Sequence, residues 1–137
     1  AYVGLYKVHQ RVADTFNRGR VLLAGDSAHV NNPIGGMGMN GGIHDAMNLA
    51  SKLADIRFNG ASPDLLDRYT RQRRKAQTDF VQAQTIRNKK SLEENDPVKR
   101  QHNLDEMRHT CEDIALHKAF LYRGALFDSL KTSNAIQ

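Results

Sequence analysis

Cysteine, tryptophan and long apolar runs are nearly absent from this chain of 137 residues. Its single cysteine, Cys111, excludes an internal disulfide and favours a reducing compartment, so we expect a cytoplasmic protein. No stretch approaches the ~20 apolar residues of a membrane span, and no charged and then apolar leader opens the chain. Hydrophobic residues make up 39% of the sequence. Such a content is typical of a helical protein with long exposed faces, or of a piece whose core is completed elsewhere.

Positive charge is in moderate excess, because 20 lysine and arginine residues stand against 15 acidic residues and give a net charge of +5. Much of this excess lies in one segment, residues 68–75. A basic patch can attract nucleic acid or an acidic membrane. The helical pattern of the segment favours a solvated helix face instead. A nucleic-acid-binding module therefore remains a remote alternative, and no nucleic-acid partner is expected.

The first part of the chain predicts strands. Residues 2–12 carry β-prone side chains in partial alternation, and a turn signal follows at residues 17–19. Residues 20–24 are continuously apolar, which is typical of a strand covered on both faces. Two strands alone do not make a stable sheet. The pattern thus implies neighbouring strands and helices that this sequence does not supply.

The rest of the chain predicts helices. A helix is expected from Asn40, with an apolar face formed by Ile43, Met47, Ala50 and Ala54. Ser62 and Pro63 then form a helix-start signal. Apolar residues recur from there at spacings of three and four, which predicts one helix from Pro63 to Leu92 with this stripe: Leu66, Tyr69, Arg73, Ala76, Phe80 and Ala83. After a break at residues 95–97, two more helices are expected, over residues 98–110 and 113–130, and the last eight residues are expected to fray.

A glycine-rich loop separates the second strand from the first helix. Residues 36–41 match G-x-G-x-x-G literally, but eleven residues separate this match from the strand and no second strand follows, which disfavours an independent dinucleotide fingerprint. Glycines let a flat ligand approach the backbone, and the helix opening near Asn40 offers unpaired N–H groups and a positive dipole end. Asp26, at the carboxyl end of the strand, can accept hydrogen bonds from sugar-like hydroxyls. The segment therefore predicts a site for a hydroxyl chain and an electron-rich ring.

The same segment closely resembles the second FAD-binding motif, the GD motif, of the FAD-dependent aromatic-ring hydroxylases, the flavoprotein monooxygenases that include para-hydroxybenzoate and phenol hydroxylases. That motif runs GRV-[LI]-L-[AI]-GD-[AS]-AH, a proline-containing loop, G-x-G-[ML]-N and G-x-x-DA-x-NL-x-x-KL. The matching positions here are residues 19–21, Gly25-Asp26-Ser27-Ala28-His29, Pro33, Gly36, Gly38-Met39-Asn40, Gly42, Asp45-Ala46, Asn48-Leu49 and Lys52-Leu53. Residues 65–74, LLDRYTRQRR, are similar to the Leu-x-x-Tyr-x-x-x-Arg-Arg pattern of the family's next helix. One departure is that the family often has Pro-Pro where this chain has Asn32-Pro33.

The resemblance implies an α/β fold, the C-terminal part of a FAD/NAD(P)-binding, glutathione-reductase-like domain, with two strands followed by a mostly helical region. Residues 1–60 would carry the end of the FAD-binding domain with the GD motif, and residues 61–137 a helical region packed on it. The family's N-terminal dinucleotide-binding portion is not found in this sequence. The chain alone is therefore expected to be inactive and to need that missing part as its partner.

The resemblance also implies site residues and a reaction. Asp26, beside Gly25, would bind the ribityl chain of FAD; Gly38, Met39 and Asn40 would lie along the pyrimidine edge of the flavin. The segment containing Pro33, Gly35 and Gly36 would border the pocket of an aromatic or phenolic substrate. NAD(P)H would reduce the flavin, and a C4a-hydroperoxide would hydroxylate the substrate. A flavin-dependent halogenase or reductase of the same fold is the alternative, and no side-chain acid or base is assigned.

Several other residues receive structural interpretations. His29 is better explained by hydrogen bonding around the cofactor loop than as a catalytic base. Asp45 is explained by the dipole of the first helical turn, and Cys111 by burial as a small apolar side chain. His102, His109 and His117 are spaced too widely for a zinc site, so no metal is expected.

Overall fold

The computed structural model describes residues 3–4 and 7–137. Four short strands in this part of the chain form two antiparallel pairs. They are β1 (Arg11–Val12) with β4 (His29–Val30), and β2 (Asn17–Arg18) with β3 (Val21–Leu22). The strand predicted over residues 2–12 lies partly outside the described residues, and among those that are described in this range, Arg11–Val12 form a strand. The predicted strand over residues 20–24 narrows to β3, and Val21 of this strand is 63% exposed. The expected covering of its two faces depends on strands and helices that this sequence does not supply, so it stays a prediction.

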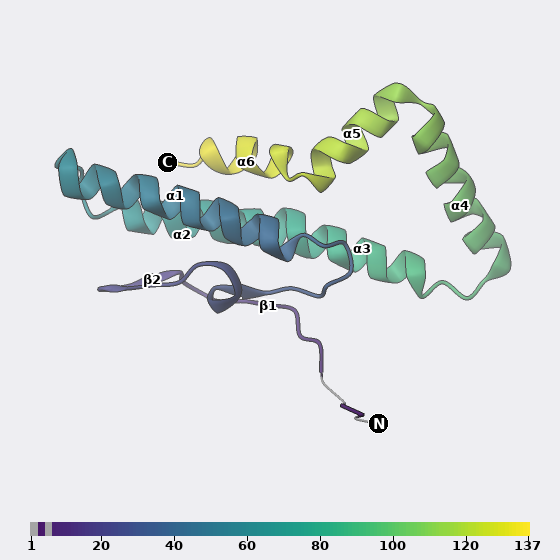
Figure 1. The fold of residues 1–137 in the computed structure, drawn as a ribbon, viewed down its shortest axis with the longest axis horizontal. Helices are drawn as coiled ribbons and strands as arrows, with labels where there is room; N and C mark the ends of the chain where they lie inside the picture. Colours follow the sequence, from purple (N-terminus) through teal and green to yellow (C-terminus); the bar gives the residue numbers. More distant parts are fainter. Residues whose placement is uncertain (1–2, 5–6) are drawn as a thin grey trace.

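Helices make up most of the remaining chain. They are α1 (Gly38–Phe58), α2 (Leu65–Ala76), α3 (Ala83–Leu92), α4 (Pro97–Glu112), α5 (Ile114–Gly124) and α6 (Phe127–Asn134). A π-helical segment, η2 (Gln77–Gln82), joins α2 to α3 without a break, which confirms the long helix predicted from its periodicity. Figure 1 shows α1 running alongside α2, with the short strands on one side of this pair and α6 on the other.

The C-terminal helices begin at identifiable caps. The Asp96 carboxylate accepts a hydrogen bond from Val98 N at the start of α4, and the Asp113 carboxylate accepts from two N–H groups at the start of α5. These backbone hydrogen bonds lower the pKa of Asp113 below its ordinary value. The single helix expected over residues 113–130 is wrong, because Leu126 adopts φ 62° and ends α5 before α6 begins.

The end of the chain is held in place rather than frayed, contrary to the prediction. The carbonyl of Ile136 accepts hydrogen bonds from Arg68 Nε at 2.9 Å and from Gln72 Nε2 at 2.8 Å. The carbonyl of Gln137 accepts two more from the Arg71 guanidinium. Two arginines of the basic segment therefore bind the returning chain, so this segment is more than a solvated face.

Two apolar clusters form the core. One joins Phe16, Ala28 and Tyr69, and so connects the strands to α2. The other joins Met37, Val81 and Leu126, and so connects the start of α1 to η2 and to the bend between α5 and α6. Both clusters support the segment between β3 and α1, which contains the predicted cofactor residues.

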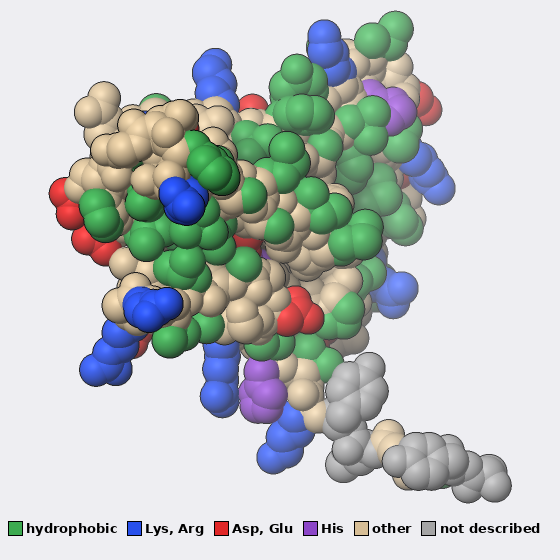
Figure 2. Space-filling view, turned by 60° about the vertical axis from the view of Figure 1, so that its left-hand side comes forward, with side chains coloured by type: hydrophobic (Ala, Val, Ile, Leu, Met, Phe, Trp, Pro, Cys, Tyr) green, Lys and Arg blue, Asp and Glu red, His purple; other side chains and the backbone are tan. Residues whose placement is uncertain are grey.

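The apolar face predicted for α1 is exposed: Ile43 is 50% and Met47 69% accessible. The helix instead turns a polar face toward α2, with Gly41 and Asp45 buried, because Asp45 pairs with a buried arginine there. Figure 2 shows apolar side chains gathered over one face of the molecule, with basic side chains projecting at its edges. Cys111 is also exposed, so its expected burial is wrong.

Within the described residues, every helix is too short or too polar to cross a membrane.

Candidate cofactor-binding site

An open hollow of about 380 Å³ lies beside the start of α1. Five of the eight predicted cofactor residues line it: Asp26, Pro33, Gly36, Gly38 and Met39. The sequence reasoning missed three further lining residues, Val30, Asn31 and Asn32. Of the other predicted residues, Asn40 lies half-buried in the first turn of α1, Gly25 lies at the start of the turn that carries Asp26, and Gly35 lines a different cleft.

The turn that presents Asp26 is fixed by close backbone packing. Gly25 has φ +59°, and a Cβ atom built on Gly42 would lie 3.4 Å from the Cα of Gly25. The Ser27 hydroxyl donates to the Ala24 carbonyl at 2.8 Å, and Ala28 N donates to the Gly25 carbonyl at 2.9 Å. The strand end therefore abuts the first turns of α1, while the Asp26 side chain remains exposed at the hollow.

The start of α1 faces this hollow with unpaired donors. Met37 is the N-cap, and its side chain makes no capping hydrogen bond. The first N–H groups of a helix have no partner within the helix, and the helix dipole is positive at that end. Gly38 and Met39, the first two helical residues, line the hollow, and Met39 is 74% exposed. The arrangement can bind an electron-rich or anionic edge of a flat ligand.

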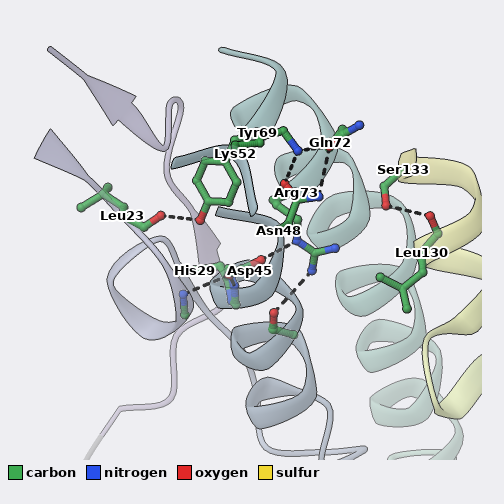
Figure 3. Close-up of polar contacts among 12 residues, drawn as sticks. Leu23, His29, Asp45, Asn48, Lys52, Tyr69, Gln72, Arg73, Leu130 and Ser133 are labelled. Carbon is green, nitrogen blue, oxygen red and sulfur yellow. Dashed lines mark hydrogen bonds and ion pairs between the residues drawn. The ribbon is translucent and has the colours of Figure 1, made fainter. Parts of the chain in front are cut away.

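A buried ionic network lies beneath the hollow, centred on Asp45 (Figure 3). Asp45 Oδ1 accepts from Arg73 Nε at 2.6 Å, while Oδ2 lies 2.6 Å from His29 Nε2 and accepts from Gly25 N at 3.0 Å. All three side chains are at most 1% exposed. Burial alone would raise the pKa of the Asp45 carboxyl, but the hydrogen bonds from His29, Arg73 and Gly25, together with the Arg73 charge, bring it below its ordinary value.

This network corrects the interpretation of Asp45. The residue lies two turns into α1, whose first turn holds no acidic residue, so the helix dipole does not explain it. Asp45 instead ties three segments together: the turn at Gly25, β4 at His29 and α2 at Arg73. Arg73 was predicted as a member of the apolar stripe and of the solvated basic segment over residues 68–75, and no partner was predicted for it. The signal that could have found its role is the Tyr-x-x-x-Arg-Arg pattern, which places an arginine on the same helix face as a buried tyrosine.

The network also reaches the hollow itself. Asn31, which lines the hollow, has its Nδ2 atom 3.1 Å from His29 Nδ1. An amide that donates to Nδ1 leaves the imidazole proton on Nε2, where it donates to Asp45. His29 is thereby engaged on both ring nitrogens. This engagement suits a structural residue, as expected, and leaves neither nitrogen free to act as a base.

Tyr69 and Gln72 extend the polar contacts along α2 (Figure 3). The Tyr69 hydroxyl donates to the Leu23 carbonyl at 2.7 Å, and burial raises the pKa of this phenol, so it stays protonated. Gln72 Oε1 accepts from Asn48 Nδ2 and from Lys52 Nζ. Burial, together with Arg68 and Arg73, lowers the pKa of Lys52. These contacts fix α1 against α2 and hold Leu23, the residue that follows β3, in place.

Comparison with known proteins identifies the family. A family model described as "FAD binding domain" matches residues 3–84. Para-nitrophenol 4-monooxygenase of Pseudomonas sp. strain WBC-3 is 42% identical over 116 residues, which are 85% of this chain and 29% of that protein. Pentachlorophenol 4-monooxygenase of Sphingobium chlorophenolicum is 47% identical over 68 residues, 50% of this chain and 13% of that protein.

Solved structures agree with these relatives. The crystal structure of p-nitrophenol 4-monooxygenase PnpA from Pseudomonas putida DLL-E4 matches with a TM-score of 0.80 and 39% identity, over 88% of this chain and 32% of that one. The chain thus spans about a third, or less, of the relatives it matches. It belongs to the FAD-binding domain family, within the superfamily of FAD-dependent aromatic hydroxylases. Its cofactor is FAD.

Proposed function

We propose that this chain supplies the GD-motif loop and the C-terminal helices of an NAD(P)H-dependent flavin monooxygenase that hydroxylates an aromatic or phenolic substrate. The observation that carries the proposal is the hollow at the start of α1, because five residues predicted from the cofactor motif line it together. The names of the relatives, which are monooxygenases of nitrophenol and chlorophenol, support the reaction class.

The residues of the hollow fit FAD in three respects. The exposed Asp26 carboxylate can accept hydrogen bonds from ribityl hydroxyls. Glycines at positions 36 and 38 allow a flat ring to approach the backbone. The start of α1 can stabilise negative charge on the flavin edge by roughly 0.3–2 kcal/mol. Bound FAD, reduced by NAD(P)H, would supply the transfer of one oxygen atom from O2 to the substrate.

The buried network has a positioning role in this proposal. Asp45 holds Gly25, and therefore the adjacent Asp26, at a fixed distance from α1. Arg73 holds the other oxygen of the same carboxylate, and its Nη2 donates to the Gly41 carbonyl at 3.4 Å. The Asp45 carboxylate therefore fixes both parts of the site: it holds the turn of Asp26 directly through Gly25, and the first turn of α1 through Arg73. Rigid placement of this kind keeps donors aimed where charge develops on the flavin.

We also propose that the chain acts as part of a longer, cytoplasmic protein and is inactive alone. In this view residues 1–60 complete a FAD-binding domain and residues 61–137 pack on it. The exposed apolar side chains of α1, such as Ile43 and Met47, support a partner segment, since contiguous exposed apolar surface marks interaction sites. The relatives, about three times as long or longer, support the same view.

The first test is FAD binding, followed by flavin absorbance and fluorescence, for this chain alone and for the chain joined to a preceding dinucleotide-binding segment. Asp26→Ala should weaken binding in whichever form binds FAD. Asp14→Ala is the matched control, because Asp14 is fully exposed away from the hollow. Failure of both forms to bind FAD would refute the proposal.

The second test concerns the reaction. The longer protein should oxidise NAD(P)H faster when its aromatic substrate is present, and the product should gain one oxygen atom. This product analysis is needed because one fold can host several reactions, so the fold alone does not separate hydroxylation from halogenation or reduction. A halogenated product, or one that gained only hydrogen, would replace the hydroxylase with a halogenase or a reductase.

A further inference from the structure

The bend between α5 and α6 packs against the start of α1, although the two lie far apart in the sequence. Leu126, the residue at this bend, is 2% exposed and joins Met37 and Val81 in one buried apolar cluster. Met37 is the N-cap of α1, and the next two residues, Gly38 and Met39, line the hollow that we assign to the flavin. A side chain of the C-terminal region therefore supports the residue from which this helix begins.

Leu126 occupies this place in a backbone conformation that leucine disfavours. Among the described residues, it is the one non-glycine residue with a positive φ, at 62°. In this region the Cβ atom crowds the following carbonyl oxygen, a contact that glycine avoids. Strained residues of this kind persist only where the surrounding structure holds them, and they cluster at functional sites. The buried cluster at the start of α1 supplies that support for Leu126.

The helix that follows the bend is held at both of its ends. At its start, Leu126 shares the cluster with Val81 of η2. Just beyond its end, the Ile136 carbonyl accepts hydrogen bonds from Arg68 and Gln72 of α2. α6 therefore runs antiparallel to α2 and η2, and Figure 1 shows it lying along them. Contacts at both ends make Leu126 a fixed point against which the start of α1 can rest.

We propose that Leu126 is a positioning residue of the flavin site: it supports Met37 and so fixes where the first N–H groups of α1 meet the flavin. This inference rests on the function proposed above. The direction of these donors matters, because a hydrogen bond weakens steeply as it bends and because preorganised donors stabilise charge that develops on the ligand. A displaced helix start should therefore bind the reduced, electron-rich flavin less well, which lowers the midpoint potential of the bound flavin.

The test replaces Leu126 in the form of the protein that binds FAD. Leu126→Ala and Leu126→Gly both remove the side chain, but glycine suits a φ of 62°, so the glycine variant should unfold at the higher urea concentration. Leu126→Met keeps a flexible apolar side chain of similar volume and should keep the midpoint potential of the parent. Leu121→Ala, at a 57% exposed position on α5, is the matched control.

The alanine and glycine variants should each lose about tenfold more affinity for reduced than for oxidised FAD. For a two-electron couple, this loss lowers the midpoint potential of the bound flavin by about 30 mV. If Leu126 acted on folding alone, the effect would instead follow the urea midpoint and be smaller in the glycine variant. A potential equal to that of the parent in both variants, or an effect that follows the urea midpoint, would overturn the inference.

Amide NMR signals give a second readout, which needs no flavin. Leu126→Gly should shift the signals of Gly38 and Met39 and leave that of Gly19, in the turn between β2 and β3, unchanged. Unchanged signals at Gly38 and Met39 would overturn the inference whether or not the protein binds FAD. A parent that binds FAD, with variants that match it, rejects only the role of Leu126, whereas a parent that binds no FAD rejects the proposed function as well.

Discussion

Replacing Asp45 with asparagine should destabilise the protein more than any other isosteric change in the site. Arg73 and Asp45 are 1% and 0% exposed at their side chains, so the substitution leaves a buried guanidinium without a counter-charge. Removing one partner of a buried pair costs about 3–5 kcal/mol. Domains of this size have a free energy of unfolding of about 5–15 kcal/mol. The substitution therefore removes a large fraction of the free energy of unfolding.

Urea unfolding followed by circular dichroism measures this effect. Asp14→Asn is the control, because the same chemical change at an exposed site should stay within about 0.5 kcal/mol of the parent. Combining Asp45→Asn with Arg73→Met removes both charges and should recover part of the loss, since a buried pair replaced by neutral groups is often tolerated. An Asp45→Asn midpoint equal to that of the parent would refute the argument.

The pH dependence gives a second readout of the same carboxylate. The folded pKa of Asp45 is lowered from its ordinary value of 3.8. When folding lowers the pKa of a carboxyl group, the ionised carboxylate stabilises the folded state. This stabilisation is fully present above the pKa of the unfolded state and is lost as the pH falls through the pKa of the folded state. The parent should therefore lose stability below about pH 4. In Asp45→Asn the free energy of unfolding should fall less steeply with decreasing pH, because this variant lacks the carboxyl group that titrates. The same pH dependence in parent and variant would contradict the assignment to Asp45.

Three further predictions follow from the site and the chain end. Asp26→Ala should weaken FAD binding about tenfold or more through lost charge-assisted hydrogen bonds, with an unchanged urea midpoint because Asp26 is exposed; unchanged affinity would remove Asp26 from the site. Gly35→Asn should cost about 1–3 kcal/mol because φ is +111° and Asn88 lies close, whereas Gly19→Asn should be tolerated at φ +58° with open space around it; equal urea midpoints would contradict this. Truncation after Ala135 should lower the thermal midpoint, since Ile136 accepts from Arg68 and Gln72; an unchanged midpoint would show that these contacts contribute nothing.

Local patterns in the sequence predicted the elements that depend on local chemistry. The periodicity of the sequence predicted the helix that the structure shows over residues 65–92, and the glycine loop predicted the start of α1. Asp26, Pro33 and Met39 line the same hollow because they belong to one contiguous motif. Features set by distant partners could not be read in this way. Arg68 reaches a carbonyl 68 residues away, and no local pattern encodes that contact.

The polar face of α1 shows why the apolar periodicity of residues 43–54 predicts the wrong buried face. Apolar residues mark a buried face only when the surface they meet is present and apolar. Here the described surface opposite α1 is α2, which presents Arg73 and Gln72, so the buried face carries Asp45 and Asn48. The apolar residues of the opposite face remain exposed in the described structure. Their pattern is real, but it indicates a contact other than the one with α2.

The helix over residues 65–92 contains the clearest case, because its predicted stripe fails at one point. Tyr69, Arg73 and Ala76 are buried as predicted, but from the start of η2 onward the buried positions are Gln77, Val81 and Thr85, while Phe80 and Ala83 are only partly buried. A π-helical turn closes i→i+5 hydrogen bonds and so rotates every later side chain relative to an α-helix. Val81 thereby packs against Met37, the N-cap of α1. The departure from regular periodicity therefore lies where this helix supports the start of α1, so it belongs to the architecture of the site.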